Sequence, residues 1–289
     1  MKKIINYYIK TKKYYKKIVI ILKLKILSSK NLEYSINNYG DIKDEIEQLL
    51  KNIIEEDESY KYMYLLIISL YENIDTLLEN LIIANHDICL KIIRSISEQL
   101  IIFKCLMQNE EYLREDFFNW SILNDYKNPK KEVELANTAK ELYDKYILKL
   151  KEYMLDKEKN IDKTEMKRNI NKLINNNYGW YYTKCKNNYN ISLNYIAKNE
   201  NCNDIYEMFK YYSEEVHNNN TRTLIIQCKH NLSMEYHVIE LLLFVQHHIL
   251  QIIKEYVPIK RYKYILNKIE KNIQYNYDKM TYYEKKFDK

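Results

Sequence analysis

Apolar residues recur along most of the chain every three or four positions, the spacing at which side chains share one face of an α-helix. Between residues 41 and 54, aliphatic side chains fall on one such face, and Asp41 stands where an N-cap residue would begin the helix. The same period predicts a helix over about 59–84. Residues 85–108 and 233–256 are apolar around almost the whole circumference, which predicts two central helices with neighbours on several sides.

Shorter periodic stretches complete the prediction. Further helices are expected near 110–126, 131–155, 164–175, 191–199 and 204–217. The sequence shows neither an internal repeat nor the alternation of apolar and polar residues that marks strands. The chain also has only two glycines and two prolines, too few for the hairpin turns of a sheet. The sequence therefore predicts an all-α fold, a multi-helix bundle with long antiparallel helices.

Charge divides the chain into three parts. Residues 1–30 contain ten lysines and no acidic residue, although the whole chain carries a net charge of only +6. The segment after Pro258 is basic as well. We therefore predict a basic N-terminal arm (1–30), a single helical-bundle domain (31–257) and a basic tail (258–289). Basic arms bind nucleic acid by counterion release or anionic membranes through the surface potential, and a solvated lysine-rich end is the plain alternative.

The signals for a membrane or an oxidising compartment are weak. The aliphatic run at 18–27 is about half the length needed to span a bilayer, and Lys23 and Lys25 interrupt it. No small-residue cleavage site follows it, so a signal peptide is not predicted. The five cysteines are odd in number and unclustered, as expected for reduced thiols. We therefore expect a cytoplasmic protein.

Arg94 and Glu98 form the most informative polar pair. In the predicted helix over 85–108 they share a helical line with Leu90 and Ile101, whereas the polar band of that helix runs elsewhere. Charged groups inside an apolar face need ionic and hydrogen-bonding partners. We therefore expect both side chains to reach other helices, either as a structural clamp or as part of a functional site.

Ser213 and His217 lie one turn apart at the end of the predicted helix over 204–217. They extend the line of Phe209 at the edge of the apolar stripe of this helix. A histidine at a helix C-terminus is stabilised in its protonated form by the helix dipole. His217 can fill a structural role, or it can act as an acid or base if it meets the charged pair in the interior of the bundle.

The sequence contains no arrangement typical of a metal or cofactor site. His237 and His248 share a helical stripe, but they lie about 16 Å apart along the axis, too far to share one metal ion. The sequence lacks the two Glu-x-x-His motifs that a di-iron bundle needs, a glycine-rich phosphate loop, paired zinc-binding cysteines and a nucleophile elbow. We therefore predict neither a metal nor a cofactor.

Three runs, RSISEQL, GWYY and IYEMFKYYSEEVH, resemble in this order a mostly bacterial family of helical proteins, domain-of-unknown-function family fifty-six seventy-seven. The resemblance covers about residues 60–220, and its pattern falls on Arg94, Glu98, Trp180, Tyr206 or Tyr211, Ser213 and His217. It implies a helical domain in which the Arg, Glu and His converge, and it carries no known activity. From it we take the Arg, Glu, Ser and His as candidate catalytic residues, and Trp180 and Tyr211 as candidate substrate-binding residues.

A looser likeness is to the HEPN ribonucleases, helical domains common in toxins and phage defence. Their mark is an arginine followed closely by a histidine on one helix, and this chain lacks it, because Arg222 and His230 are too far apart. Arg94 and His217 could assemble the same chemistry from two helices, which is an argument by analogy.

Two functions are therefore open, and the sequence does not decide whether the protein is an enzyme. In the first, the polar residues bind or cleave RNA or another phosphate-bearing partner, with Arg94 holding phosphate and His217 serving as acid or base. In the second, the chain is a non-enzymatic interaction module, and the polar cluster only fixes helix packing. Attachment of residues 1–27 to an anionic membrane is a weaker third hypothesis, and either function allows a homodimer.

Overall fold

The computed structural model describes residues 32–82, 86–109, 111–126, 133–157, 161–184, 189–217, 231–257 and 259–287. These residues form helices and turns with no strand among them, so the predicted all-α bundle is confirmed. The basic arm at 1–30 lies outside them. They divide into two compact units, the first made of the residues up to Ile96 and from Phe209 onward, and the second of Ser97–Met208.

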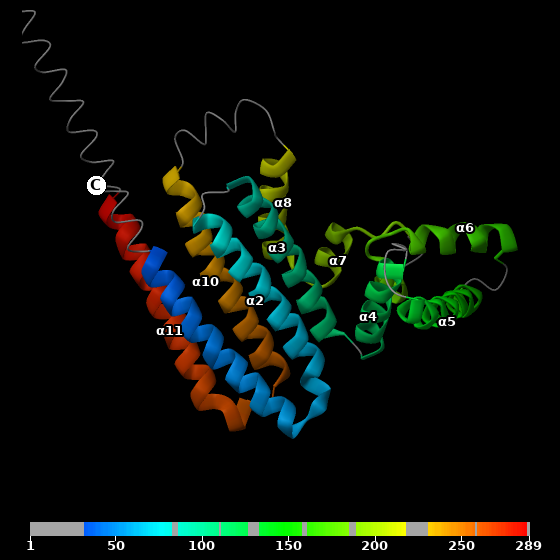
Figure 1. Cartoon of the computed structure of the whole chain (residues 1–289), viewed down its shortest axis with the longest axis horizontal. Helices are drawn as coiled ribbons and strands as arrows, with labels where there is room; N and C mark the ends of the chain where they lie inside the picture. The colour runs from blue at the N-terminus through cyan, green and yellow to red at the C-terminus, as the bar shows by residue number, and fades with distance from the viewer. Residues whose placement is uncertain are drawn as a thin grey trace, which may run out of the picture. The chain divides into compact units, whose positions relative to one another are not determined.

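Long helices lying side by side build the first unit (Figure 1). They are the helix over residues 32–56, α2 (Lys61–Ile82), α10 (Asn231–Tyr256) and α11 (Ile259–Phe287), joined by parts of α3 (His86–Gln108) and α8 (Asn203–His217). The short 3-10 helix η1 (Glu58–Tyr60) reverses the chain before α2. Its N-cap Asp57 accepts a hydrogen bond from the Ser59 amide at 2.9 Å, which fixes this turn.

Aliphatic residues at helical spacing fill the core of the first unit. The inner face of the 32–56 helix is buried, and its apolar residues are Ile42, Ile46, Leu49, Leu50 and Ile53. The aliphatic residues of α10 are buried around several sides of the helix, at Leu241, Leu242, Leu243, Val245, Ile249 and Ile253. The expectation that this last apolar helix packs within a bundle is confirmed by its contacts with α2 and α11.

The first helix begins earlier than the sequence indicates. Residues 32–40 are already helical, so Asp41 lies inside the helix, and its prediction as an N-cap is wrong. The neighbouring Gly40 does not interrupt the helix. Burial of Tyr39 and Ile42 against the bundle outweighs the cost of about 1 kcal/mol that a helical glycine carries relative to alanine.

Most of the segment expected to be a basic tail forms α11 and packs on the first unit. Four side chains of one face, Tyr262, Leu266, Ile269 and Ile273, are buried. Ion pairs join this helix to its neighbours: Arg261–Glu56 at 2.7 Å, Lys254–Glu270 at 2.5 Å, and Lys268–Glu45. Residues 259–287 therefore belong to the folded structure, whereas a single domain over 31–257 stays a prediction.

The second unit surrounds a cluster of aromatic rings. It comprises α4 (Glu111–Tyr126), α5 (Val133–Lys157), α6 (Lys163–Ile174), the 3-10 helix η2 (Gly179–Lys184) and α7 (Leu193–Asn199), with the adjoining parts of α3 and α8. The buried aromatic residues of this unit are Phe103, Trp120, Tyr146, Trp180, Tyr181 and Tyr182. Tyr146 and Tyr153 both meet Tyr182 edge to face, with ring centroids 5.9 and 5.0 Å away. The periodicity did not predict η2, which supplies three of these rings.

No helix in the described part of the chain is both long and apolar enough to cross a membrane.

Candidate functional site

Arg94 lies on α3 against the ring of Phe209 on α8, within the first unit. Its guanidinium carbon is 5.2 Å from the centre of that ring, inside the range of a cation–π contact. Arg94 and Phe209 are both half-buried, so the arginine is less enclosed than the sequence predicts. Its partner from another helix is thus an aromatic face.

Ser213 and His217 follow Phe209 at one-turn intervals along α8. The Ser213 hydroxyl donates a hydrogen bond to the Phe209 carbonyl oxygen at 2.7 Å, a bond within its own helix. This bond engages the hydroxyl proton within α8, and the catalytic role of Ser213 stays a prediction. The helix extends to His217 as predicted. The His217 side chain lies outside the described residues, so its convergence with Arg94 and Glu98 stays a prediction.

Glu98, one turn after Arg94 on α3, is held within the second unit. The Tyr178 hydroxyl donates to its Oε1 atom at 2.7 Å. The turn that carries this tyrosine is itself fixed, because the Asn176 side chain accepts from the Tyr178 amide and donates to the Ile191 carbonyl, both at 2.8 Å. Tyr178 is thus a partner of Glu98 that the sequence does not indicate, and the convergence of Glu98 with His217 stays a prediction. Glu98 is also half-buried.

The two aromatic candidates occupy different environments. Trp180 is only 1 % exposed and meets Phe117 edge to face, with ring centroids 5.2 Å apart. It is a core residue of the second unit, and its role in substrate binding stays a prediction. Tyr211 is 50 % exposed on α8, next to the buried Tyr212. Tyr211 therefore offers an accessible ring close in sequence to Phe209.

A second polar group in the second unit centres on Glu200. Its carboxylate accepts from the Tyr181 hydroxyl and, at 2.9 Å, from the Asn109 side chain. Burial is the main reason that the pKa of Tyr181 and the pKa of the nearby Cys105 are both raised, so both groups stay protonated at neutral pH. Burial likewise raises the pKa of Cys202 to about 12. These thiols are therefore poor nucleophiles.

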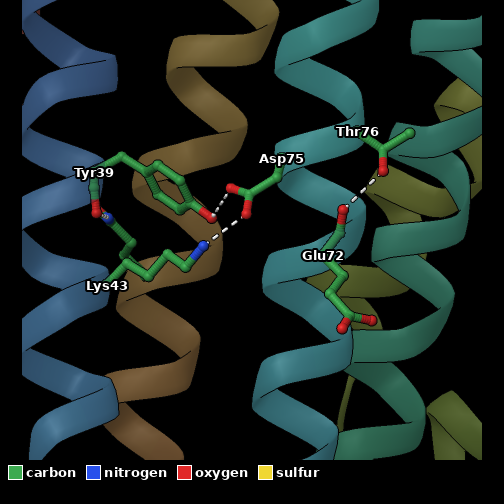
Figure 2. A network of polar contacts seen from close by, with 6 residues as sticks. Tyr39, Lys43, Glu72, Asp75 and Thr76 are labelled. Atoms are coloured by element: carbon green, nitrogen blue, oxygen red, sulfur yellow. Dashed lines mark hydrogen bonds and ion pairs between the residues drawn. The ribbon is translucent and has the colours of Figure 1, made fainter.

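A third polar group joins the 32–56 helix to α2 (Figure 2). Asp75 accepts from Lys43 at 2.6 Å and from the Tyr39 hydroxyl at 3.2 Å. Burial, and secondarily the negative charge of Asp75, raises the pKa of Tyr39. Tyr39 also meets Tyr71 edge to face at 5.9 Å, which ties the polar group to the core. This arrangement links two helices, and no pattern in the sequence indicates that these side chains meet.

Metal binding finds no support in the described side chains. No group of three or more His, Cys, Asp or Glu residues among them is gathered as ligands of one ion would be.

The candidate residues therefore fall into two sets. Arg94, Phe209, Ser213 and Tyr211 belong to the first unit, and Glu98, Trp180 and Tyr178 belong to the second. Sequence reasoning missed Phe209 as the partner of Arg94 and missed Tyr178 altogether. Tyr178 directly precedes the GWYY run, which is the one signal that could have drawn attention to it.

Comparison with known proteins assigns the chain to a family. None of the curated proteins and none of the solved structures compared with it matches. A family model described as "Family of unknown function (DUF5677)" matches residues 57–229, more than half of the chain, and confirms the resemblance seen in the sequence. No finding supports the looser likeness to HEPN ribonucleases. The chain belongs to the DUF5677 family of unknown function.

Proposed function

We propose that the protein binds a phosphate-bearing partner, with RNA as the first candidate, where α3 meets α8 in the first unit. The supporting observation is the guanidinium of Arg94 over the ring of Phe209. A cation–π contact positions the guanidinium without using its N–H groups as hydrogen-bond donors. Two such groups match two oxygens of one phosphate.

The surroundings of Arg94 favour an anionic ligand. Half-burial lowers the local dielectric constant, so attraction to a phosphate is stronger there than at a fully exposed arginine. No carboxylate among the described residues forms an ion pair with Arg94. Tyr211 is half-exposed on α8, but it follows Phe209 by two positions and faces away from it, so it can stack only on a base beyond the phosphate at Arg94. An RNA partner would also fit the toxin or phage-defence role suggested by the HEPN likeness.

Binding fits the geometry better than cleavage. His217 follows Phe209 by eight residues, which is about 12 Å along the axis of α8. Such a separation suits contact with a neighbouring phosphate better than proton transfer at the phosphate held by Arg94. The hydroxyl of Ser213 is already bonded to its own helix. We therefore propose that the protein binds its partner without cleaving it. Catalysis by His217 is supported by the sequence pattern alone.

The alternative is an interaction module in which all these polar groups only fix helix packing. Two observations favour it: the bond from Tyr178 to Glu98 and the bond from Ser213 to its own helix. Neither bond involves Arg94, so a variant of Arg94 distinguishes the two functions.

Substituting Arg94 by Lys tests the proposal. We expect the affinity of the full-length protein for a fluorescein-labelled RNA, measured by fluorescence anisotropy, to fall about tenfold, because lysine keeps the charge but loses the stacked, bidentate geometry. The matched control is Lys91→Gln, an exposed cation one turn earlier on α3, for which we expect a loss below about threefold. Equal affinities for wild type and Arg94→Lys would support the packing alternative.

A further inference from the structure

The solvent-facing side of α11 carries basic, aromatic and amide side chains in one band. Its exposed members recur every three or four residues, opposite the buried face of the helix, and are Lys260, Lys263, Tyr264, Asn267, Lys271 and Tyr275. Over the whole helix, eight lysines and arginines stand against three acidic residues. The band therefore presents positive charge and aromatic rings on the same surface.

The two tyrosines of this band are unusually open to solvent. Tyr264 is 81 % exposed and Tyr275 is 57 % exposed. They lie eleven residues apart, about 16 Å along the axis. Neither ring belongs to the core of the first unit, which lies on the opposite face, although the Tyr275 ring also lies 5.6 Å from Lys279 Nζ. Exposed rings beside lysines are the combination with which proteins hold unpaired bases.

Three acidic residues on or beside this helix are paired with cations other than the three lysines of the band. The pairs are Lys268–Glu45, Arg261–Glu56 and Lys254–Glu270. The carboxylate of Asp278 accepts from the Gln274 side chain at 2.9 Å. Among the described residues, no ion pair involves Lys260, Lys263 or Lys271, so these three charges remain available to an anionic partner.

We propose that this face of α11 binds single-stranded nucleic acid, with the three lysines along the phosphates and Tyr264 and Tyr275 stacked on bases. An anionic membrane fits the band less well, because an interfacial helix inserts aliphatic and large apolar side chains, and tyrosines are the only large hydrophobic residues exposed among the described part of α11. The surface is separate from Arg94 and lies outside the residues that match the family model. It is therefore a property of this chain, independent of the function proposed for α3 and α8.

The lysines are tested by the salt dependence of binding. The full-length protein is titrated into a fluorescein-labelled oligouridylate of about 20 nucleotides at several salt concentrations. In Lys260→Gln/Lys263→Gln/Lys271→Gln, the slope of log affinity against log salt should fall by about 2, because each single-strand phosphate contact contributes about 0.7. The matched control, Lys140→Gln/Lys145→Gln/Lys151→Gln, removes the same charge from exposed positions on α5 and should keep the slope. Equal slopes in the two triple variants would overturn the proposal.

The tyrosines are tested by affinity at one salt concentration. Tyr264→Ala/Tyr275→Ala should weaken binding at least about 25-fold, since each stacked ring contributes about fivefold or more, while the salt slope stays as in wild type. Circular dichroism checks that the variants keep their helices. Undiminished binding would contradict stacking. The proposal would also be contradicted if the protein bound phosphatidylserine vesicles through the three lysines but bound the oligonucleotide equally well without them. If the α11 variants lose affinity for the oligonucleotide and Arg94→Lys binds normally, the α11 surface is supported and the α3–α8 proposal is rejected. If only Arg94→Lys loses affinity, the α3–α8 proposal is supported and the α11 surface is rejected.

Discussion

Gly179→Ala is expected to lower the free energy of unfolding of the second unit by about 3 kcal/mol or more. A β-carbon at this position would overlap the backbone carbonyl oxygen of Leu173 and lie 2.8 Å from the ring of Trp120. Neither neighbour can move easily. The Leu173 carbonyl accepts from the Asn176 amide at 3.1 Å in the turn after α6, and Trp120 is only 3 % exposed against Tyr146. The dihedral angles of Gly179 are not the cause, because its φ is not positive.

Tryptophan fluorescence is the appropriate measurement for this variant. The only two tryptophans of the chain, Trp120 and Trp180, lie in the second unit, so their emission during denaturant titration reports on that unit. Gly40→Ala provides the matched control. No atom lies within 4 Å of a β-carbon built at Gly40 inside the 32–56 helix, so the alanine should leave the tryptophan transition unchanged and stabilise its own helix, followed by circular dichroism, by about 0.5–1 kcal/mol. A Gly179→Ala variant as stable as wild type would show that α6 and η2 are not packed as described.

Lys149→Met is expected to destabilise the second unit by about 2–3 kcal/mol near neutral pH. Lys149 pairs at 2.6 Å with Asp116, whose side chain is 1 % exposed, and its removal leaves a buried carboxylate without its cation. The expected cost is below that of a fully buried pair because the side chain of Lys149 is 46 % exposed to water. Lys145→Met, at an exposed position on the same helix, is the control and should change stability little.

The pH dependence separates this mechanism from lost packing. Burial raises the pKa of Asp116 above its ordinary value, and Lys149 opposes that rise. Because the folded state then holds the proton more tightly than the unfolded chain, this carboxyl group favours folding at low pH. Its contribution is lost as pH rises through the folded-state pKa. Removing Lys149 raises that pKa further, so the deficit of Lys149→Met should shrink on acidification. A deficit that stays constant in denaturant titrations across acidic and neutral pH would contradict a charge effect.

The helices could be predicted from the sequence because their signal is local. An apolar residue every three or four positions identifies α2, α3 and α10, and burial then follows from the width of the apolar face. The same rule applies to α11, whose buried Tyr262, Leu266, Ile269 and Ile273 have helical spacing. The lysines between them drew attention to charge and away from that spacing, so the segment was predicted as a tail.

The partners of the polar residues could not be predicted in the same way. Helical periodicity showed that Arg94 and Glu98 need contacts from another element, but it cannot say which distant residue supplies them. Glu98 is bonded to Tyr178, eighty residues away, in a turn without a periodic pattern. Arg94 meets the ring of Phe209, an apolar residue that a search for polar partners passes over. Membership of the DUF5677 family, whose function is unknown, does not indicate an activity for these residues.

The site at α3 and α8 is tested most directly by photo-cross-linking to RNA that contains 4-thiouridine. The full-length protein is irradiated with the RNA and digested with trypsin, and the cross-linked peptides are identified by mass spectrometry. Cleavage after Lys210 and Arg222 releases the peptide that begins at the half-exposed Tyr211. We expect a cross-link in this peptide whose yield falls strongly in Arg94→Lys and is kept in Lys91→Gln. Cross-links confined to other segments, or a Tyr211 cross-link of equal yield in Arg94→Lys, would contradict RNA binding at this site.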